Sequence, residues 1–176
     1  SGICQFNSEK QAFVKVFSSG YSIGNIIHTL YQDINNNLWI GTNEGLLVSE
    51  KPQIVNGKIH VQDIPLGNEA LSVNAIFQAE ENNIWAGTGG GGLFKVLVDK
   101  GFKELDIDHF QYNSLLPSSL SDDIVLCLFE DRMGLMWIGT NSGLNKFDPK
   151  KQSFRNITSV EGSTYNLSDN TVWSIY

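Results

Sequence analysis

A short pattern recurs three times along the chain and constrains the fold more strongly than any other feature of the sequence. Each copy begins with an apolar residue, a tryptophan, a second apolar residue, a glycine and a threonine, and ends in a glycine and a leucine. The copies span Leu38–Leu46, Ile84–Leu93 and Met136–Leu144. Their tryptophans are 46 and 52 residues apart, and periods of roughly 40–50 residues are typical of β-propeller blades.

The residues around each copy predict about four short strands per repeat. An apolar run ends at an aromatic residue eight positions before each tryptophan, and a polar turn such as Asp131–Gly134 follows it. We therefore predict an all-β chain of β-propeller blades with about four antiparallel strands each, all belonging to one propeller domain. The expected blades are residues 24–64, 70–112 and 121–158, with 1–17 as the end of a preceding blade and 167–176 as the first strand of a following one.

Because the pattern starts and stops within blades, the chain is expected to be a partial propeller. A blade buries its two faces only against neighbouring blades, so several units must stack around an axis. The start of the chain aligns with residues 142–154, and its end aligns with residues 120–129.

These motifs resemble the two-component regulator propeller repeat. The resemblance rests on Leu167–Tyr176, which reads LSDNTVWSIY, and on the LWIGTNEGL run of Leu38–Leu46. Such repeats occur in tandem in the periplasmic sensors of hybrid two-component systems of gut Bacteroidetes, including Bacteroides. The resemblance implies a periplasmic segment of an inner-membrane protein that forms a homodimer through its full ectodomain. It also implies that the whole protein carries a cytoplasmic histidine kinase.

The charge of the chain excludes some classes of partner. Lys and Arg number 12 against 19 Asp and Glu, which gives a net charge of −7. Nucleic-acid binding depends on clustered basic residues, so we expect none, and an anionic membrane surface is disfavoured as well. The sequence contains no apolar run near the roughly 20 residues of a membrane-spanning helix, so we expect no membrane contact by this segment.

The repeated tryptophans and glycines are expected to be structural. A tryptophan is large enough to fill the gap between two blades, although ligand stacking is an alternative role. The glycine two positions later predicts a close approach of backbones, and the glycine before the final leucine predicts a hairpin with positive φ. The structural residues are Trp39, Trp85, Trp137, Gly41, Gly87 and Gly139.

One variable position suggests where a ligand could bind. The first strand of a propeller blade lines the central channel, and equivalent positions there hold His28, Asn74, Leu126 and Trp173. The loops after the tryptophan strands add Asn43, Gly89 and Asn141. We take His28, Asn74, Trp173, Asn43 and Asn141 as the candidate ligand-binding residues. The alternative is that all of them are ordinary channel-filling and turn residues.

The sequence predicts no catalytic residue, metal site or cofactor. Gly87–Gly92 fits GxGxxG, but an alternating strand follows it instead of a helix, so nucleotide binding is not expected. Cys4 and Cys127 lack metal spacing, and Cys127 fits a small core hydrophobe. The polar cluster of Asp106, Asp108 and His109 is interpreted as part of a solvated insertion between blades.

The leading hypothesis is a non-catalytic sensor segment that detects an oligosaccharide and signals to the kinase. Aromatic rings with Asn and His donors suit such a ligand, since hydroxyl groups need paired hydrogen bonds. A structural or protein-interaction scaffold, with the ligand bound elsewhere, remains an alternative. A propeller lyase or hydrolase is a third alternative, for which the channel positions supply a single titratable residue, His28.

Overall fold

The computed structural model describes residues 3–15, 26–53, 58–67, 69–80, 82–99, 102, 105–159 and 166–176. Within these ranges every element of regular secondary structure is a β-strand. The strands form three four-stranded sheets and one two-stranded hairpin. In every sheet, each strand pairs antiparallel with the next strand in the chain. The predicted all-β architecture of four-stranded propeller blades is confirmed.

The strands follow the repeat. The hairpin consists of β1 (Cys4–Asn7) and β2 (Ala12–Lys15). The first sheet contains β3 (Ile27–Gln32), β4 (Leu38–Thr42), β5 (Leu46–Ser49) and β6 (Gln62–Ile64). The second contains β7 (Val73–Glu80), β8 (Asn83–Thr88), β9 (Leu93–Val98) and β10 (Leu105–Phe110). The third contains β11 (Val125–Glu130), β12 (Met136–Thr140), β13 (Gly143–Asp148) and β14 (Ser153–Ile157).

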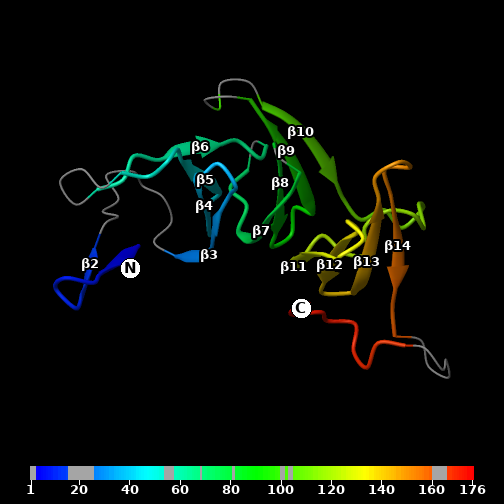
Figure 1. Ribbon diagram of the computed structural model, residues 1–176. Helices are drawn as coiled ribbons and strands as arrows, with labels where there is room; N and C mark the ends of the chain where they lie inside the picture. The colour runs from blue at the N-terminus through cyan, green and yellow to red at the C-terminus, as the bar shows by residue number, and fades with distance from the viewer. Residues whose placement is uncertain are drawn as a thin grey trace.

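The three sheets lie side by side in an arc, as Figure 1 shows. The first strands lie at the inside of the arc, where β7 contacts β3 on one side and β11 on the other. The fourth strands β6, β10 and β14 lie at the outside. This arrangement makes the first strand of each sheet its innermost strand, which is the position that a propeller channel requires.

The hydrophobic core lies between the sheets and not within any one of them. One cluster joins Trp39 and Ile64 of the first sheet to Ile84 and Phe94 of the second. A second cluster joins Trp85 of the second sheet to residues of the third. Each four-stranded sheet therefore depends on its neighbour for burial, as expected for stacked repeats.

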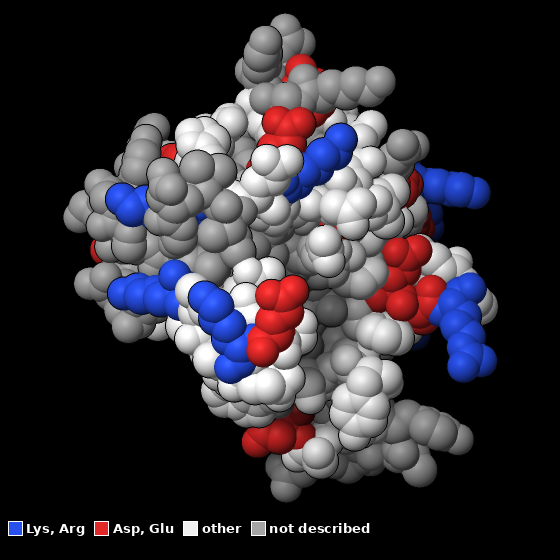
Figure 2. Space-filling view, turned by 60° about the vertical axis from the view of Figure 1, so that its left-hand side comes forward, with Lys and Arg blue, Asp and Glu red and all other residues white. Residues whose placement is uncertain are grey.

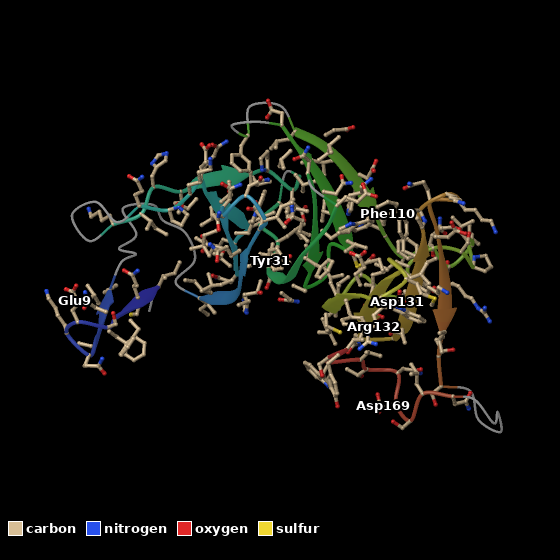
Figure 3. All side chains as sticks on the ribbon, in the orientation of Figure 1. Glu9, Tyr31, Phe110, Asp131, Arg132 and Asp169 are labelled. Atoms are coloured by element: carbon tan, nitrogen blue, oxygen red, sulfur yellow. The ribbon has the colours of Figure 1, made fainter. Side chains whose placement is uncertain are left out.

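Aromatic rings dominate the packing between the second and third sheets. The ring centroids of Trp85 and Phe147 are 5.1 Å apart in an edge-to-face arrangement, and Trp85 also stacks on Phe110 at 5.8 Å. Phe110 contacts Phe154 edge-on at 5.5 Å. Figure 3 shows Phe110 at the end of β10, beside the third sheet. These separations lie in the favourable range for aromatic pairs, so the cluster fixes the two sheets against each other.

The hairpin β1–β2 repeats the register of β13–β14. Phe6 pairs with Phe13 across the hairpin, as Phe147 pairs with Phe154. The rings of Phe6 and Phe13 also meet edge-on, with centroids 5.3 Å apart. The two hairpins are therefore built alike, in agreement with the alignment of the start of the chain with residues 142–154.

One expectation about local structure was wrong. Asp106, Asp108 and His109 do not lie in a solvated insertion but on β10, which pairs with β9 over its whole length. Residues 167–176, where a first blade strand was expected, are assigned no strand. Val172 in this segment nevertheless lies beside Gly139, as Val73 lies beside Gly41 and Val125 beside Gly87, and its N–H donates to the backbone oxygen of Thr140.

Candidate ligand-binding site on the inner strands

Each inner strand carries a β-bulge at the same position. The pairing with the second strand skips one residue between Ile27 and Thr29, between Val73 and Ala75, and between Val125 and Cys127. The skipped residues are His28, Asn74 and Leu126. A bulge leaves one residue without a ladder partner and redirects its side chain, and bulges are over-represented beside functional sites.

The alignment of the repeats within the chain therefore selected the bulge residue of each four-stranded sheet. His28 is exposed, whereas Asn74 and Leu126 are half-buried. Trp173, the fourth candidate of the series, is 74% exposed and lies in the segment of residues 166–176 that packs against the third sheet. Figure 3 shows Asp169 in this same segment, beneath the third sheet.

Asn74 already has a structural role. Its Nδ2 donates a hydrogen bond of 3.1 Å to the backbone oxygen of Val125 on the neighbouring inner strand. Its Oδ1 accepts a hydrogen bond of 3.0 Å from the hydroxyl of Ser72. Asn74 thus joins β7 to β11, and a ligand would have to compete with both bonds.

The loop positions Asn43, Gly89 and Asn141 share one backbone contact. Their N–H groups donate to the carbonyl oxygens of Ile26, Ser72 and Ile124, at distances of 3.2, 2.8 and 3.0 Å. This contact ties the loop after the second strand to the start of the inner strand. Asn43 and Asn141 therefore lie close to the bulges of their own sheets, with Asn43 half-buried and Asn141 exposed.

The repeated glycines lie where neighbouring sheets meet. A Cβ on Gly41 would lie 2.6 Å from the backbone oxygen of Val73 on the next inner strand. A Cβ on Gly87 would overlap Val125 Cγ1, and one on Gly139 would lie 2.7 Å from the backbone oxygen of Val172. The glycine of each second strand thus allows the neighbouring inner strand to approach, and this approach brings the bulges together.

The three tryptophans differ in their surroundings. Trp39 and Trp85 are buried between sheets, with exposed fractions of 0% and 3%. Trp137 is half-buried, and Lys146 Nζ lies 5.5 Å from its ring centroid. None of the three is among the residues of the bulge series.

Two of these tryptophans are each held by an aspartate that was not among the predicted residues. Asp33 Oδ2 accepts a hydrogen bond of 2.9 Å from Trp39 Nε1, and Asp131 Oδ2 accepts one of 2.9 Å from Trp137 Nε1. Figure 3 labels Asp131 and Arg132 in the turn between β11 and β12. The signal in the sequence was an aspartate six residues before the tryptophan in two of the three repeats.

The hydrogen bond from Trp137 lowers the pKa of Asp131. Burial acts in the opposite direction, while the N–H groups of Leu135 and Met133 and the charge of Lys146 add to the lowering. Asp131 is therefore charged at neutral pH, and its role is to close the turn and orient the tryptophan.

The second sheet lacks this aspartate and has Ala79 in its place. Asn83, the first residue of β8, donates from Nδ2 to Glu80 Oε2 at 2.6 Å. Its Oδ1 is buried and has no hydrogen-bond partner among the described residues. In the first sheet, the equivalent Asn37 bonds to Asp33 at 2.9 Å and accepts the Lys51 N–H at 3.2 Å.

Cys127 lies beside the third bulge. Burial raises the pKa of its thiol, partly offset by a hydrogen bond from the backbone of Gly139. The thiol lies 3.4 Å from the backbone oxygen of Val172 and donates to it. This environment keeps the thiol protonated and fits the predicted role of a small hydrophobe.

The face in Figure 2 carries both Lys or Arg and Asp or Glu side chains, in small groups separated by uncharged surface. No three His, Cys, Asp or Glu side chains of the described ranges come together in a way that could hold a metal ion. Those ranges also contain no helix long and apolar enough to cross a membrane.

The fold and the repeated bulges define a segment of a β-propeller. The family described as two component regulator propeller matches residues 21–44 and 119–142, which include β3 with β4 and β11 with β12. Both segments are therefore similar to the two-component regulator propeller repeat, as the motifs predicted.

Three known proteins similar to this chain are much longer than it is. Histidine kinase P4 of Formosa agariphila is 26% identical over 179 residues, which cover 97% of this chain and 12% of that protein. The extracellular domain of a one-component system of B. thetaiotaomicron superimposes with a TM-score of 0.74 at 20% identity, covering 99% of this chain and 22% of that domain. The extracellular domain of a hybrid two-component system of B. thetaiotaomicron gives a TM-score of 0.62 at 19% identity, covering 86% of this chain and 20% of that domain.

These likenesses establish the fold. The chain spans 12% of the curated relative and about a fifth of each solved extracellular domain.

Proposed function

We propose that this chain is a non-catalytic, ligand-sensing propeller segment of a two-component sensor. Its place is the periplasm, in the extracytoplasmic part of an inner-membrane protein that signals through a homodimer to a cytoplasmic histidine kinase. The extracellular domains with the same fold and the relative with a kinase name support this placement. The ligand we propose is an oligosaccharide bound at the mouth of the channel.

The repeated bulge is the observation that carries the ligand proposal. It sets one residue of each inner strand apart from the ladder, and these residues differ from sheet to sheet while the bulge recurs at the same position. A repeated frame with variable side chains suits the recognition of one particular ligand. The donors and rings of His28 and Trp173 suit hydroxyl groups and the apolar face of a sugar ring.

The proposal is non-catalytic because the bulge series offers one titratable side chain, His28. General acid–base chemistry on a glycan requires two positioned groups in most mechanisms. A lyase or hydrolase activity would need residues beyond this series.

One observation favours the alternative of a structural or protein-interaction scaffold. Asn74 uses its Nδ2 and Oδ1 in bonds to Val125 and Ser72, so this bulge residue serves the packing of the sheets. In that case the bulges would fix the spacing of the inner strands, and the ligand would bind elsewhere in the sensor.

The test is the ligand response of the complete sensor in cells, read from a kinase-controlled reporter. The variants His28→Ala and Trp173→Ala are expected to raise the ligand concentration for half-maximal response at least tenfold. Leu30→Ala serves as the matched control, because Leu30 is 49% exposed on the same strand as His28 but lies outside the bulge. An unchanged response in both test variants would remove the channel as the site and favour the scaffold.

A further inference from the structure

A groove of about 330 Å³ lies on the outer rim, between the ends of the second and third sheets. Its lining comes from β10, from the loop of residues 111–119 and from the turn before β14. The polar side chains of the lining are those of His109, Gln111, Tyr112, Asn113, Ser118 and Gln152, with a further hydroxyl from Ser119. The volume falls at the lower end of the range of small-ligand sites.

We propose that this rim groove binds a neutral sugar residue of an oligosaccharide. The site lies away from the bulges, because β10 is an outer strand while β3, β7 and β11 are inner strands. The inference therefore goes beyond the channel-mouth proposal, and the two can be tested separately.

The described lining of the groove carries no Lys, Arg, Asp or Glu. Lys, Arg, Asp and Glu make up 18% of the chain, yet none of the described residues that line the groove is one of them. A charged ligand would lose its hydration in the groove without meeting an opposite charge, which is unfavourable. An apolar ligand would cover the amide and hydroxyl groups without pairing them, which is unfavourable as well.

Two amide side chains of the lining retain hydrogen-bonding capacity. Gln152 donates from Nε2 to the backbone oxygen of Pro149 at 3.0 Å, which leaves its Oε1 available as an acceptor. Asn113 Oδ1 accepts the N–H of Leu115 at 2.9 Å, which leaves Nδ2 available as a donor. Sugar hydroxyl groups both donate and accept, so they can use the two amides together.

An exposed aromatic ring lies at the edge of the groove. The Tyr112 side chain is 52% exposed, although its backbone is fixed by a hydrogen bond of 2.7 Å from its N–H to Asp123 Oδ1. The C–H face of a neutral sugar is apolar and can lie on such a ring, while the tyrosine hydroxyl remains available to water or ligand.

The loop of residues 111–119 is held in place by its own hydrogen bonds. Asn113 and Ser119 join the two ends of the loop. The Asn113 N–H donates to Ser119 Oγ at 2.9 Å, and the Ser119 hydroxyl donates to the backbone oxygen of Asn113 at 3.1 Å. The Phe154 N–H also donates to the oxygen of Ser118 at 2.8 Å, which ties the loop to β14. A ligand would therefore order little of the loop on binding, which favours affinity.

The experiment is a calorimetric titration of the intact protein with neutral gluco-, manno- and galacto-oligosaccharides of two to six residues, and with oligogalacturonates as charged counterparts. Tyr112→Ala is expected to weaken the binding of a neutral oligosaccharide about three- to tenfold, the effect of losing one aromatic contact. Leu115→Ala is the matched control, because Leu115 is 90% exposed on the same loop and does not line the groove. It is expected to leave the dissociation constant unchanged.

A second variant, Gln152→Ala, keeps the test valid if Tyr112→Ala alters the fold, which circular dichroism would detect. The proposal is overturned if no neutral oligosaccharide binds, or if binding is equally strong in the wild type and in the correctly folded groove variants. Binding that is lost in His28→Ala or Trp173→Ala but kept in the groove variants would support the channel mouth and overturn the rim site. Preference for oligogalacturonates would overturn the rim site too.

Discussion

Replacing Gly87 by alanine tests how the sheets approach each other. The new Cβ would overlap Val125 Cγ1 and lie 3.0 Å from Val125 Cβ, on the inner strand of the next sheet. Val125 is fully buried and β-branched, so it cannot turn away easily. Extra methyl groups in a packed core cost about 1–3 kcal/mol, and for a chain of this size each kcal/mol lowers Tm by about 2–4 °C.

A double-mutant cycle separates this clash from any other effect of the alanine. Val125→Ala alone removes two buried methyl groups, which costs about 1.6 kcal/mol from transfer alone. In the double variant the alanine at position 87 occupies space that Val125 has vacated, so the combined loss should be smaller than the sum of the single losses by at least about 1 kcal/mol.

The assay is urea unfolding of the wild type, the two single variants and the double variant. Gly89→Ala is the control with the milder contact, because its Cβ would come no closer than 3.3 Å to any neighbouring atom, the nearest being Asn74 Nδ2. Additive losses in the cycle would refute the reasoning, since they would mean that position 87 and Val125 do not compete for the same space.

Three further predictions concern the blades. Trp85→Ala should lower the free energy of unfolding by about 3–5 kcal/mol, and Trp137→Ala by clearly less because Trp137 is only half-buried; urea titration yielding equal losses would contradict this. Asn145→Leu should cost about 1–3 kcal/mol in the same assay, because the Ser121 N–H and the Ile138 oxygen lose their partner; an unchanged stability would refute that role. Asp131→Asn should lower Tm at neutral pH, and the gap to the wild type should narrow as the pH falls below about 4. The folded-state pKa of Asp131 is lowered, so its stabilisation is complete above the unfolded pKa and is lost as the pH falls through the folded pKa. A gap that stays constant between pH 2 and 7 would contradict that assignment.

The sequence predicted the second strands best, because their tryptophan and glycine serve contacts that every sheet makes. Trp39 and Trp85 fill the space between sheets, and Gly41 and Gly87 allow the next inner strand to approach. These requirements recur at each interface, so the same residue types recur in the chain.

The outer strand β10 was not predicted because half of it is polar. Asp106 and Asp108 are exposed while Leu105 and Ile107 are half-buried, and the carboxylates were taken as the sign of a loop. One of these carboxylates has a charged partner on the neighbouring strand, because Lys95 Nζ of β9 lies 3.7 Å from Asp108 Oδ2. The alternation was present in the sequence, but the longer connection between these repeats obscured it.

The bulges were beyond sequence reasoning even though their residues were selected. The run from Ile124 to Phe129 is uniformly apolar, so it shows no break in alternation at Leu126. The register shift appears only in the pairing with the second strand. Likewise, the alignment proposed Asn74 as a ligand residue, but its bond to Val125 depends on the distance between two sheets.

Titration calorimetry of the intact protein with plant and host oligosaccharides, compared with its His28→Ala and Trp173→Ala variants, tests the central claim most directly. The sensor proposal predicts saturable binding of one glycan class, with the dissociation constant raised at least tenfold in each variant. Heat signals that are absent across the whole panel, with a protein that is folded, would contradict it and would direct the search to protein partners of the propeller.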